Sequence, residues 1–171
     1  SSDLKRDRFK IETIQEYETT NDVEPILEDC LEEGAAIIYA NTVDRAMMFY
    51  DFFEKKGIKT VVYHSRFTEP DKQKKEDELI GMLGREAWEE ERAGGIAILT
   101  QIGEMSINIS ADIMVSELCP IDRLTQRAGR MCRFDKEKVG SLHIIVPLKN
   151  GDIYPAPYGE FNKEEKGWVP L

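Results

Sequence analysis

Arginine is the residue type whose spacing in this 171-residue chain most directly suggests chemistry. Residues 121–134 read Ile-Asp-Arg-Leu-Thr-Gln-Arg-Ala-Gly-Arg-Met-Cys-Arg-Phe, with four arginines at intervals of three or four positions. Guanidinium groups are permanently charged and match phosphate oxygens in a two-pronged geometry. For any one pair of these arginines, a solvated basic helix face is the simpler interpretation. Four of them, combined with glutamine and glycine, predict a phosphate site.

The arginine segment itself predicts a helix that begins near Pro120 and Asp122, because an aspartate can accept a hydrogen bond from a first-turn N–H. Helical spacing gives this segment a basic face and an apolar face. The basic face would carry Arg123, Arg127 and Arg130, and the apolar face would carry Leu124, Ala128 and Met131. We therefore expect the apolar face to pack on a sheet and the arginine face to meet an anion.

Composition narrows the class of protein. The length suits one domain with a real core, and no apolar run is long enough to span a membrane. The net charge of -10 argues against nucleic-acid binding by bulk charge, although residues 123–138 are net basic. The three cysteines show neither zinc-site nor disulfide spacing, which favours a reducing cytoplasm, and we predict no metal site.

Alternating hydrophobic patterns predict an α/β domain. Short apolar runs indicate strands at residues 10–17, 35–40, 60–63, 95–99, 112–116 and 141–146. Between them lie helical patterns: one capped by Asp22 and ended by Gly34, one over 44–56, one from Pro70 to about Leu83, and the arginine helix. This order predicts βαβ units and a mostly parallel sheet covered on both faces. We place the domain at residues 1–147 and an extended tail, rich in proline and aromatic residues, at 148–171.

Polar clusters follow three of the predicted buried strands. They are Asn41-Thr42, His64-Ser65-Arg66 and Thr100-Gln101. Open α/β sheets bind ligands outside the carboxyl ends of their strands, so these clusters and the arginine helix should gather along one edge. Each cluster alone has an ordinary structural explanation, a helix cap or a hydrogen-bonded histidine. Together they suit the oxygens of a phosphodiester backbone.

Two features of nucleotide hydrolases are missing from the sequence. The chain has no Gly-x-x-x-x-Gly-Lys-Ser/Thr loop, and Asp77-Glu78 lies in a predicted charged helix, not after an apolar strand as a magnesium-binding carboxylate of the usual kind would. Converging arginines can still stabilise a phosphoryl group as it develops charge. We therefore expect the chain to complete a nucleotide site but not to hydrolyse a nucleotide alone.

The residues quoted so far resemble the second RecA-like domain of superfamily 2 helicases. Residues 126–133 match that superfamily's motif VI, residues 100–109 match motif V, and residues 37–42 occupy the position of motif IV. Tyr63-His64-Ser65-Arg66-Phe67 and the segment from Ala111 to Arg127 resemble the CRISPR-associated helicase–nuclease of type I systems in particular. The resemblance implies a RecA-like three-layer α/β/α domain, followed by a tail that leads to an accessory region.

The resemblance also implies an activity and a set of partners. It implies ATP-driven 3′-to-5′ movement along single-stranded DNA, with unwinding of target DNA while a nuclease degrades it. ATP and Mg²⁺ would be bound mainly by a first RecA-like domain outside this chain. Further implied partners are an HD-type nuclease domain or subunit and a CRISPR RNA-guided surveillance complex, in the cytoplasm and away from membranes.

The resemblance assigns roles residue by residue. Catalytic residues would be Arg130 and Arg133, near the γ-phosphate, and Gln126, which would couple the nucleotide site to nucleic acid. Nucleotide contacts would come from Asn108, Glu104 and Arg127. DNA contacts would come from Asn41, Thr42, His64, Ser65, Arg66, Thr100 and Gln101.

One position departs from the family pattern, and two alternatives stay open. The family usually has aspartate at the position of Asn108, where it is expected to bind the ribose; asparagine keeps the hydrogen bonds without the charge. A DEAH-type RNA helicase has a similar motif V, although the His-Ser-Arg-Phe segment weighs against it. A helicase-derived module that binds a partner protein without motor activity fits the acidic charge but leaves the arginines without a purpose.

Overall fold

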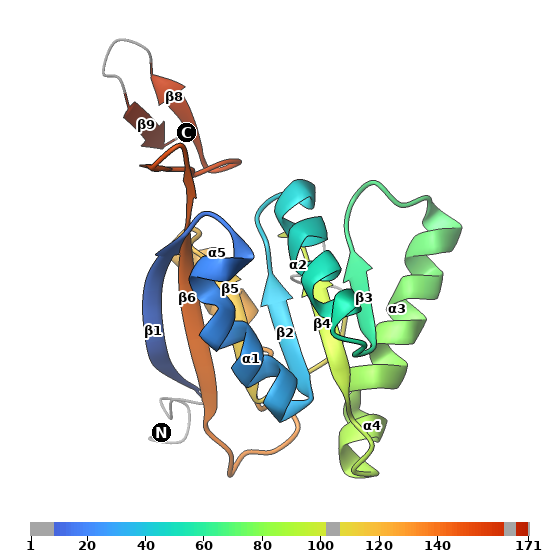
Figure 1. Cartoon of the computed structure of the whole chain (residues 1–171). Helices are drawn as coiled ribbons and strands as arrows, with labels where there is room; N and C mark the ends of the chain where they lie inside the picture. The colour runs from blue at the N-terminus through green and yellow to red at the C-terminus, as the bar shows by residue number, and fades with distance from the viewer. Residues whose placement is uncertain (1–8, 102–106, 163–166, 171) are drawn as a thin grey trace.

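The computed structural model describes residues 9–101, 107–162 and 167–170 (Figure 1). The main sheet has the strand order β1-β6-β5-β2-β4-β3, and β7 pairs with the end of β6. Its strands are β1 (Phe9–Tyr17), β2 (Ala35–Tyr39), β3 (Thr60–Tyr63), β4 (Gly95–Leu99), β5 (Ile113–Glu117), β6 (Gly140–Lys149) and β7 (Asp152–Ile153). All pairings in this sheet are parallel except the one between β6 and β7. The mostly parallel sheet predicted from the sequence is confirmed.

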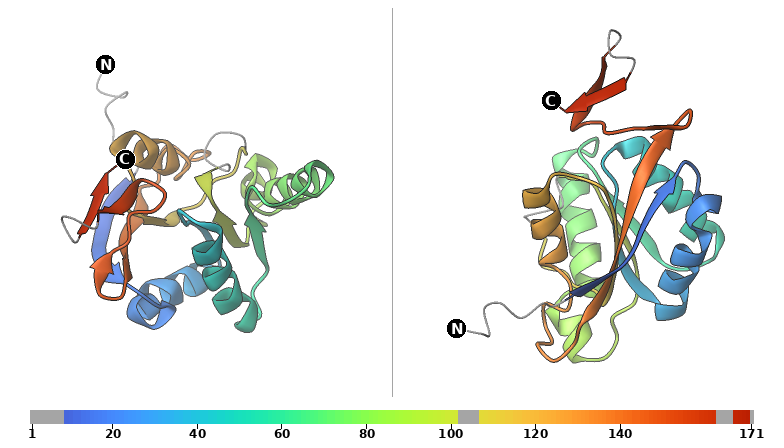
Figure 2. Two further views of the ribbon diagram at one scale, coloured as in Figure 1. Left: turned by 90° about the horizontal axis from the view of Figure 1, so that it is seen from above. Right: turned by 90° about the vertical axis from the view of Figure 1, so that its left-hand side faces the viewer.

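Helices cover both faces of the sheet (Figure 2). One face is covered by α1 (Glu24–Glu33) and α2 (Val43–Lys55), and the other by α3 (Glu69–Leu83), α4 (Arg85–Glu89) and α5 (Ile121–Ala128). The two faces accordingly carry two separate clusters of buried apolar residues. This is the three-layer α/β/α arrangement.

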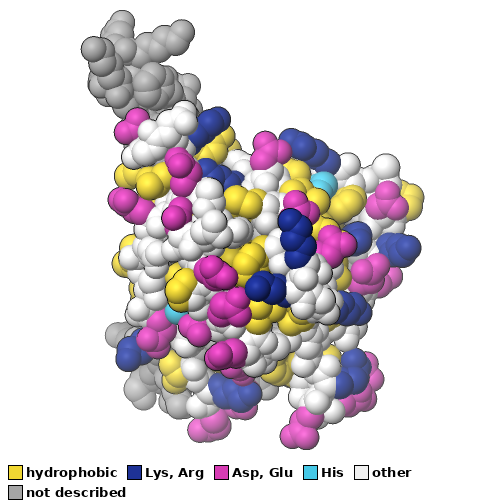
Figure 3. Space-filling model, in the orientation of Figure 1, with side chains coloured by type: hydrophobic (Ala, Val, Ile, Leu, Met, Phe, Trp, Pro, Cys, Tyr) yellow, Lys and Arg dark blue, Asp and Glu magenta, His cyan; other side chains and the backbone are white. Residues whose placement is uncertain are grey.

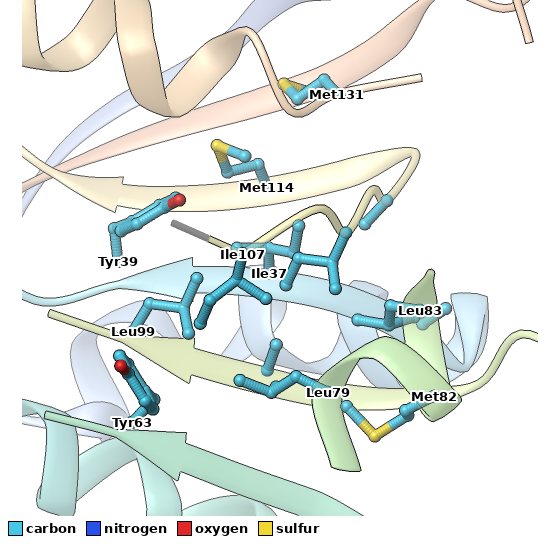
Figure 4. Packing of buried hydrophobic residues seen from close by; sticks show 14 of the residues in the cluster. Ile37, Tyr39, Tyr63, Leu79, Met82, Leu83, Leu99, Ile107, Met114 and Met131 are labelled. Carbon is cyan, nitrogen blue, oxygen red and sulfur yellow. The ribbon is translucent and has the colours of Figure 1, made fainter. Parts of the chain in front are cut away.

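The apolar runs of the sequence explain why these strands lie at the centre. Every residue of β2, β4 and β5 is buried, since both faces of these strands meet helices. On the α3 and α5 side, Ile37 and Leu99 pack with Leu79 and Met131, as Figure 4 shows. This packing fixes the strand ends from which the polar loops begin.

Of two predicted helix starts, one needs correction. Asp22 does not cap α1: it belongs to a 3₁₀ turn, η2 (Thr20–Val23), where its carboxylate accepts the backbone N–H groups of Glu18 and Thr19. The helix α1 begins afterwards at Glu24 and ends, as predicted, at Gly34 in the left-handed conformation. The start predicted near Pro120 and Asp122 is confirmed: α5 begins at Ile121 with Pro120 as its N-cap residue, and Asp122 lies in the first turn.

The arginine helix is shorter than predicted. α5 ends at Ala128, and the following residues turn back toward the sheet, where Met131 forms a bridge with Ala111. Burial of Met131, which is 0% exposed, and a positive φ of 49° at Cys132 take the chain out of the helical path. Arg127 and Arg130 are therefore not neighbours on one helix face, and the predicted basic face does not exist.

The chain after β5 and α5 contains further strands. β6 runs to Lys149, two residues past the proposed domain boundary at residue 147. Beyond it, β8 (Gly159–Asn162) and β9 (Gly167–Pro170) pair as an antiparallel two-stranded sheet (Figure 1). The division into a domain and a tail stays a prediction.

Among the described residues, no helix is both long and apolar enough to cross a membrane.

Candidate functional site

The predicted polar clusters lie at the carboxyl ends of neighbouring strands. Asn41 follows β2, His64 follows β3, and Thr100 follows β4, which lies between them in the sheet. The backbone N–H of Thr100 donates to the carbonyl oxygen of Tyr63 at 3.2 Å, so the ends of β3 and β4 stay in register. The convergence expected from the sheet topology is therefore present for these three loops. We call this side of the domain the carboxyl edge.

Arg127 is the centre of a buried hydrogen-bond network at the carboxyl edge. The residue is 0% exposed. Its Nη2 donates to Asn41 Oδ1 at 3.0 Å, and its Nη1 donates to Ser116 Oγ at 3.0 Å and to the Glu117 carbonyl oxygen at 3.3 Å. The guanidinium also lies 5.0 Å from the centre of the Tyr39 ring, within reach of a cation–π interaction. Arg127 thus joins α5 to the ends of β2 and β5.

The carboxylate of Glu117 completes this network from the end of β5. Oε2 accepts the Tyr17 hydroxyl at 2.6 Å, and Oε1 accepts the Asn41 backbone N–H at 2.7 Å. Burial raises the pKa of Glu117, while these two hydrogen bonds and the charges of Arg45 and Arg127 oppose that rise. Burial and the neighbouring carboxylate raise the pKa of the Tyr17 phenol in turn, so Tyr17 stays a donor. We call Arg127, Asn41, Ser116, Glu117 and Tyr17 the buried network.

Asn41 belongs to this network with its whole side chain. Its Oδ1 accepts from Arg127, and its Nδ2 donates to the Leu118 carbonyl oxygen at 2.8 Å; the residue is 5% exposed. Thr42 next to it is the N-cap of α2, and its hydroxyl accepts the Arg45 N–H at 3.3 Å. DNA contacts by Asn41 and Thr42 stay predictions, while the structure shows both side chains already serving the fold.

The residues after β3 divide into a fixed histidine and two exposed neighbours. His64 is buried, its ring stacks on Phe67 with centres 4.1 Å apart, and Nδ1 accepts the Arg66 N–H at 3.1 Å. Burial, and secondarily the charge of Arg66, lowers the pKa of His64, so the ring is neutral near pH 7. Ser65 and Arg66 are exposed, and the Arg66 guanidinium lies 3.9 Å from the Asp44 carboxylate.

A second group of residues forms around Arg133, which we call the arginine turn (130–133). Arg133 Nη1 donates to Asn108 Oδ1 at 2.8 Å, and the Arg133 backbone N–H donates to Ser110 Oγ at 2.8 Å. Arg133 is half-buried and Asn108 is exposed. Arg130, 2% exposed, donates from Nη1 to the Ile107 carbonyl oxygen. The structure thus brings together Arg130, Arg133 and Asn108, three of the predicted site residues.

The remaining predicted site residues lie away from the arginine turn, and one lies outside the described residues. Gln126 is exposed on α5, one position before the buried Arg127. Gln101 donates from Nε2 to the Tyr158 hydroxyl at 3.0 Å. Glu104 lies outside the described residues. Arg127, predicted to contact the nucleotide, shares the buried network with Asn41, so its predicted nucleotide contact finds no support in these bonds.

Sequence reasoning missed Glu117, Tyr17 and Tyr158. Glu117 had a usable signal, because a carboxylate directly after four apolar or small residues of a buried strand must find donors. Tyr17 and Tyr158 had none, since their partners lie 100 and 57 positions away in the sequence. Cys132 is 2% exposed, and burial with the nearby Asp112 raises its pKa to about 12, which supports a packing role.

The donor set at the arginine turn suits a nucleotide without its metal. An exposed amide and a guanidinium can bind ribose hydroxyls and phosphate oxygens. No group of three or more histidine, cysteine or acidic side chains within the described residues could hold a metal ion.

Comparison with solved structures identifies the fold. T. fusca Cas3 bound to AMPPNP superimposes with a TM-score of 0.70 and 21% identity, covering 88% of this chain and 19% of that one. The C-terminal domain of the DEAD-box protein Dbp5 superimposes with a TM-score of 0.58 and 18% identity, covering 85% of this chain and 80% of that one. The fold is therefore the RecA-like α/β domain of helicases.

Sequence comparison identifies the family. The family model described as the C-terminal part of the CRISPR-associated nuclease/helicase Cas3 matches residues 32–136. The putative CRISPR-associated nuclease/helicase Cas3 of Myxococcus xanthus is 34% identical over 153 residues, covering 86% of this chain and 20% of the relative. That of Methanocaldococcus jannaschii is 36% identical over 135 residues, covering 76% and 18%. This chain belongs to the Cas3 family, as its C-terminal helicase domain, and spans about one fifth of these relatives.

Proposed function

We propose that this chain is the second motor domain of an ATP-driven translocase that moves along single-stranded DNA and unwinds target DNA for degradation. Its place in the Cas3 family and its RecA-like fold support this function. The full-length parent would act as an ATP-dependent helicase, whereas this chain, which has no phosphate-binding loop of the Gly-x-x-x-x-Gly-Lys-Ser/Thr type, would be inactive alone.

The observation that carries the proposal is the arginine turn. Arg133 is only half-buried, and its Nη1 donates at 2.8 Å to the oxygen of the exposed Asn108 amide, so this pair lies at the surface of the domain. Arg133 would stabilise charge on the γ-phosphate during transfer, and Asn108 would contact the ribose. Arg130 would join Arg133 at the phosphate after leaving the Ile107 carbonyl oxygen. Gln126 would couple this site to the DNA.

ATP with Mg²⁺ fits this division of labour. T. fusca Cas3 has been solved with AMPPNP, with ADP and with ATP, which makes an adenine nucleotide the first ligand to test. The nucleotide supplies the phosphoanhydride bond whose hydrolysis drives movement. The metal would be held by the first RecA-like domain, and this chain would add donors from its arginine turn.

The carboxyl edge would carry the DNA backbone. Ser65 and Arg66 are exposed there, and the neutral His64 ring leaves Nε2 as a donor because Nδ1 already accepts a bond. Thr42, Thr100 and Gln101 lie along the same edge. Asn41 would hold the loop that follows β2 in place through its bonds to Arg127 and Leu118. The opposite edge instead has a hollow of about 880 Å³ whose lining includes Asp29, Glu32 and Glu33, and which would repel phosphates.

The same proposal includes the partners of the whole protein. One solved relative is described as part of a CRISPR RNA-guided surveillance complex before nicking, superimposing with a TM-score of 0.67. We infer that the parent of this chain meets a surveillance complex of that kind in the cytoplasm and works with an HD-type nuclease domain or subunit.

The test is the ATPase activity of the full-length parent, measured alone, with single-stranded DNA and with single-stranded RNA. We expect DNA to stimulate hydrolysis and RNA to have little effect. Arg130→Ala should abolish the stimulated rate while ATP binding persists, since arginine fingers contribute on the order of 10³–10⁵ in rate. Arg92→Ala, an exposed arginine bonded to Glu90 near the opposite edge, is the matched control.

Each alternative has its own outcome in this experiment. Stimulation by RNA instead of DNA would assign the chain to an RNA helicase. A parent without ATPase activity under any condition would favour a partner-binding module. Normal hydrolysis by Arg130→Ala would remove the arginine turn from the mechanism.

A further inference from the structure

The chain leaves the main sheet and then returns to the carboxyl edge at one tyrosine. β6 and β7 form a hairpin, and the Tyr154 N–H donates to the Pro147 carbonyl oxygen at 2.7 Å. The Tyr158 N–H donates to the Pro155 carbonyl oxygen at 2.7 Å, in a turn just before β8. These bonds bring the half-buried Tyr158 side chain back to the end of β4, where it meets Gln101.

The Tyr158 hydroxyl accepts hydrogen bonds from residues of two different motifs. Gln101 Nε2 donates to it at 3.0 Å from the end of β4, and Arg127 Nη2 donates to it at 3.4 Å from α5. Gln101 lies in the segment that matches motif V (100–109), and Arg127 lies in the segment that matches motif VI (126–133). One oxygen atom therefore links the chain after the sheet to both motifs.

The bonds to the Tyr158 hydroxyl contribute less to the stability of the fold than the other bonds of Arg127. Arg127 already donates to Asn41, Ser116 and the Glu117 carbonyl oxygen, all at shorter distances than to Tyr158. Gln101 and Tyr158 are only half-buried, so water can replace the hydroxyl there. Loss of the Tyr158 hydroxyl should change the relative placement of the two motifs more than the stability of the domain.

We propose that Tyr158 is a positioning residue that couples the chain after the sheet to Gln101 and Arg127. The inference rests on the proposed motor function. When the region that follows Tyr158 shifts, the tyrosine hydroxyl moves with it and changes how Gln101 meets DNA beside the network around Arg127. The region after β6 is then part of the transmission between DNA and nucleotide.

The experiment compares Tyr158→Phe with wild type in the full-length parent. The ratio of DNA-stimulated to unstimulated ATPase rate should fall about 10-fold, the size expected for loss of a hydrogen bond to a charged group. The melting temperature should change little. Tyr50→Phe, which removes the hydroxyl of a half-buried tyrosine on the opposite face of the sheet, should keep the wild-type ratio.

A double-mutant cycle tests whether the hydroxyl acts through Gln101. If it does, Tyr158→Phe with Gln101→Ala should lower the ratio no further than the more severe single change. A wild-type ratio in Tyr158→Phe, or additive losses in the double variant, would overturn the inference while loss of activity in Arg130→Ala still supported the motor. A wild-type parent that DNA does not stimulate would overturn both.

Discussion

The two halves of the segment 121–134 contain the same residue type in opposite situations. Arg127 is fully buried and donates to the Asn41 side chain after β2 and to the Ser116 hydroxyl and Glu117 carbonyl oxygen of β5. Arg133, six positions later, is half-buried and bonded to the exposed amide of Asn108. A buried charge that loses its partners is costly, whereas a partly exposed charge can exchange one partner for another. We therefore interpret Arg127 as a structural residue and Arg133 as the residue available to a ligand.

The surface of the molecule carries many acidic side chains, which bears on how either arginine could attract a phosphate. Acidic side chains are spread over the face in Figure 3, with lysine and arginine between them. On a chain of net charge -10, a phosphate is attracted by local arrangement and not by overall charge. The difference between Arg127 and Arg133 is thus one of burial and partners.

The largest effect is expected for Arg127→Ala. Removing the guanidinium leaves the Glu117 carboxylate buried with fewer opposing charges, and the unfolding free energy should fall by about 3–5 kcal/mol. Urea unfolding of the chain measures it. Arg123→Ala, an exposed arginine on the same helix, should change the unfolding free energy by less than about 0.5 kcal/mol. Equal effects of the two variants would show that the buried network contributes nothing particular.

A smaller loss of stability is expected for Glu117→Gln. The amide keeps the shape of the side chain but can accept only at one of the two positions that now accept from Tyr17 and Asn41. The unfolding free energy should fall by about 1–3 kcal/mol. Glu16→Gln, at an exposed position of β1, is the control. A stabilised Glu117→Gln variant would mean that relief of the buried charge outweighs its bonds.

Asn108→Ala changes the surroundings of Arg133 instead of those of Arg127. It removes the acceptor that holds Arg133 Nη1, and the pair is too exposed to matter for folding. We expect the ATPase turnover of the full-length parent to fall about 10-fold, with an unfolding free energy within about 0.5 kcal/mol of wild type. Unchanged turnover would indicate that Arg133 does not depend on Asn108 for its position.

The smallest effect concerns pH. Burial lowers the pKa of His64 and His143 below the ordinary value of 6.5. The unfolded chain then binds more protons than the folded one, so stability is full above about pH 6.5 and is lost as the pH falls toward the lowered values. Unfolding free energies at pH 7.5 and 5.5 should differ less in His143→Gln than in wild type. An equal difference would exclude His143 as a contributor.

The fold could be predicted from local patterns for a physical reason. The runs 35–40, 61–63 and 96–99 are short, continuously apolar and bounded by polar or glycine residues, a pattern that favours buried parallel strands. The carboxyl-edge loops then follow from the sheet topology alone. Gly34 could be recognised as a helix end because its left-handed conformation costs little.

The parts that could not be predicted depend on distant residues. Helical spacing placed Arg127 and Arg130 on one face, but tertiary packing of Met131 ended the helix two residues before Arg130. The burial of Arg127 required acceptors from positions 41, 116 and 117, which no local pattern connects to it. The pairing of Arg133 with Asn108 likewise joins two motifs 25 positions apart.

The most direct test of the division between Arg127 and Arg133 is a pair of measurements on Arg133→Ala in the full-length parent. We predict that the DNA-stimulated rate of ATP hydrolysis, measured in a single turnover with saturating ATP, falls by at least about 100-fold. The unfolding midpoint should stay at the wild-type value. Hydrolysis at the wild-type rate, or a loss of rate matched by a loss of folded protein, would contradict the account.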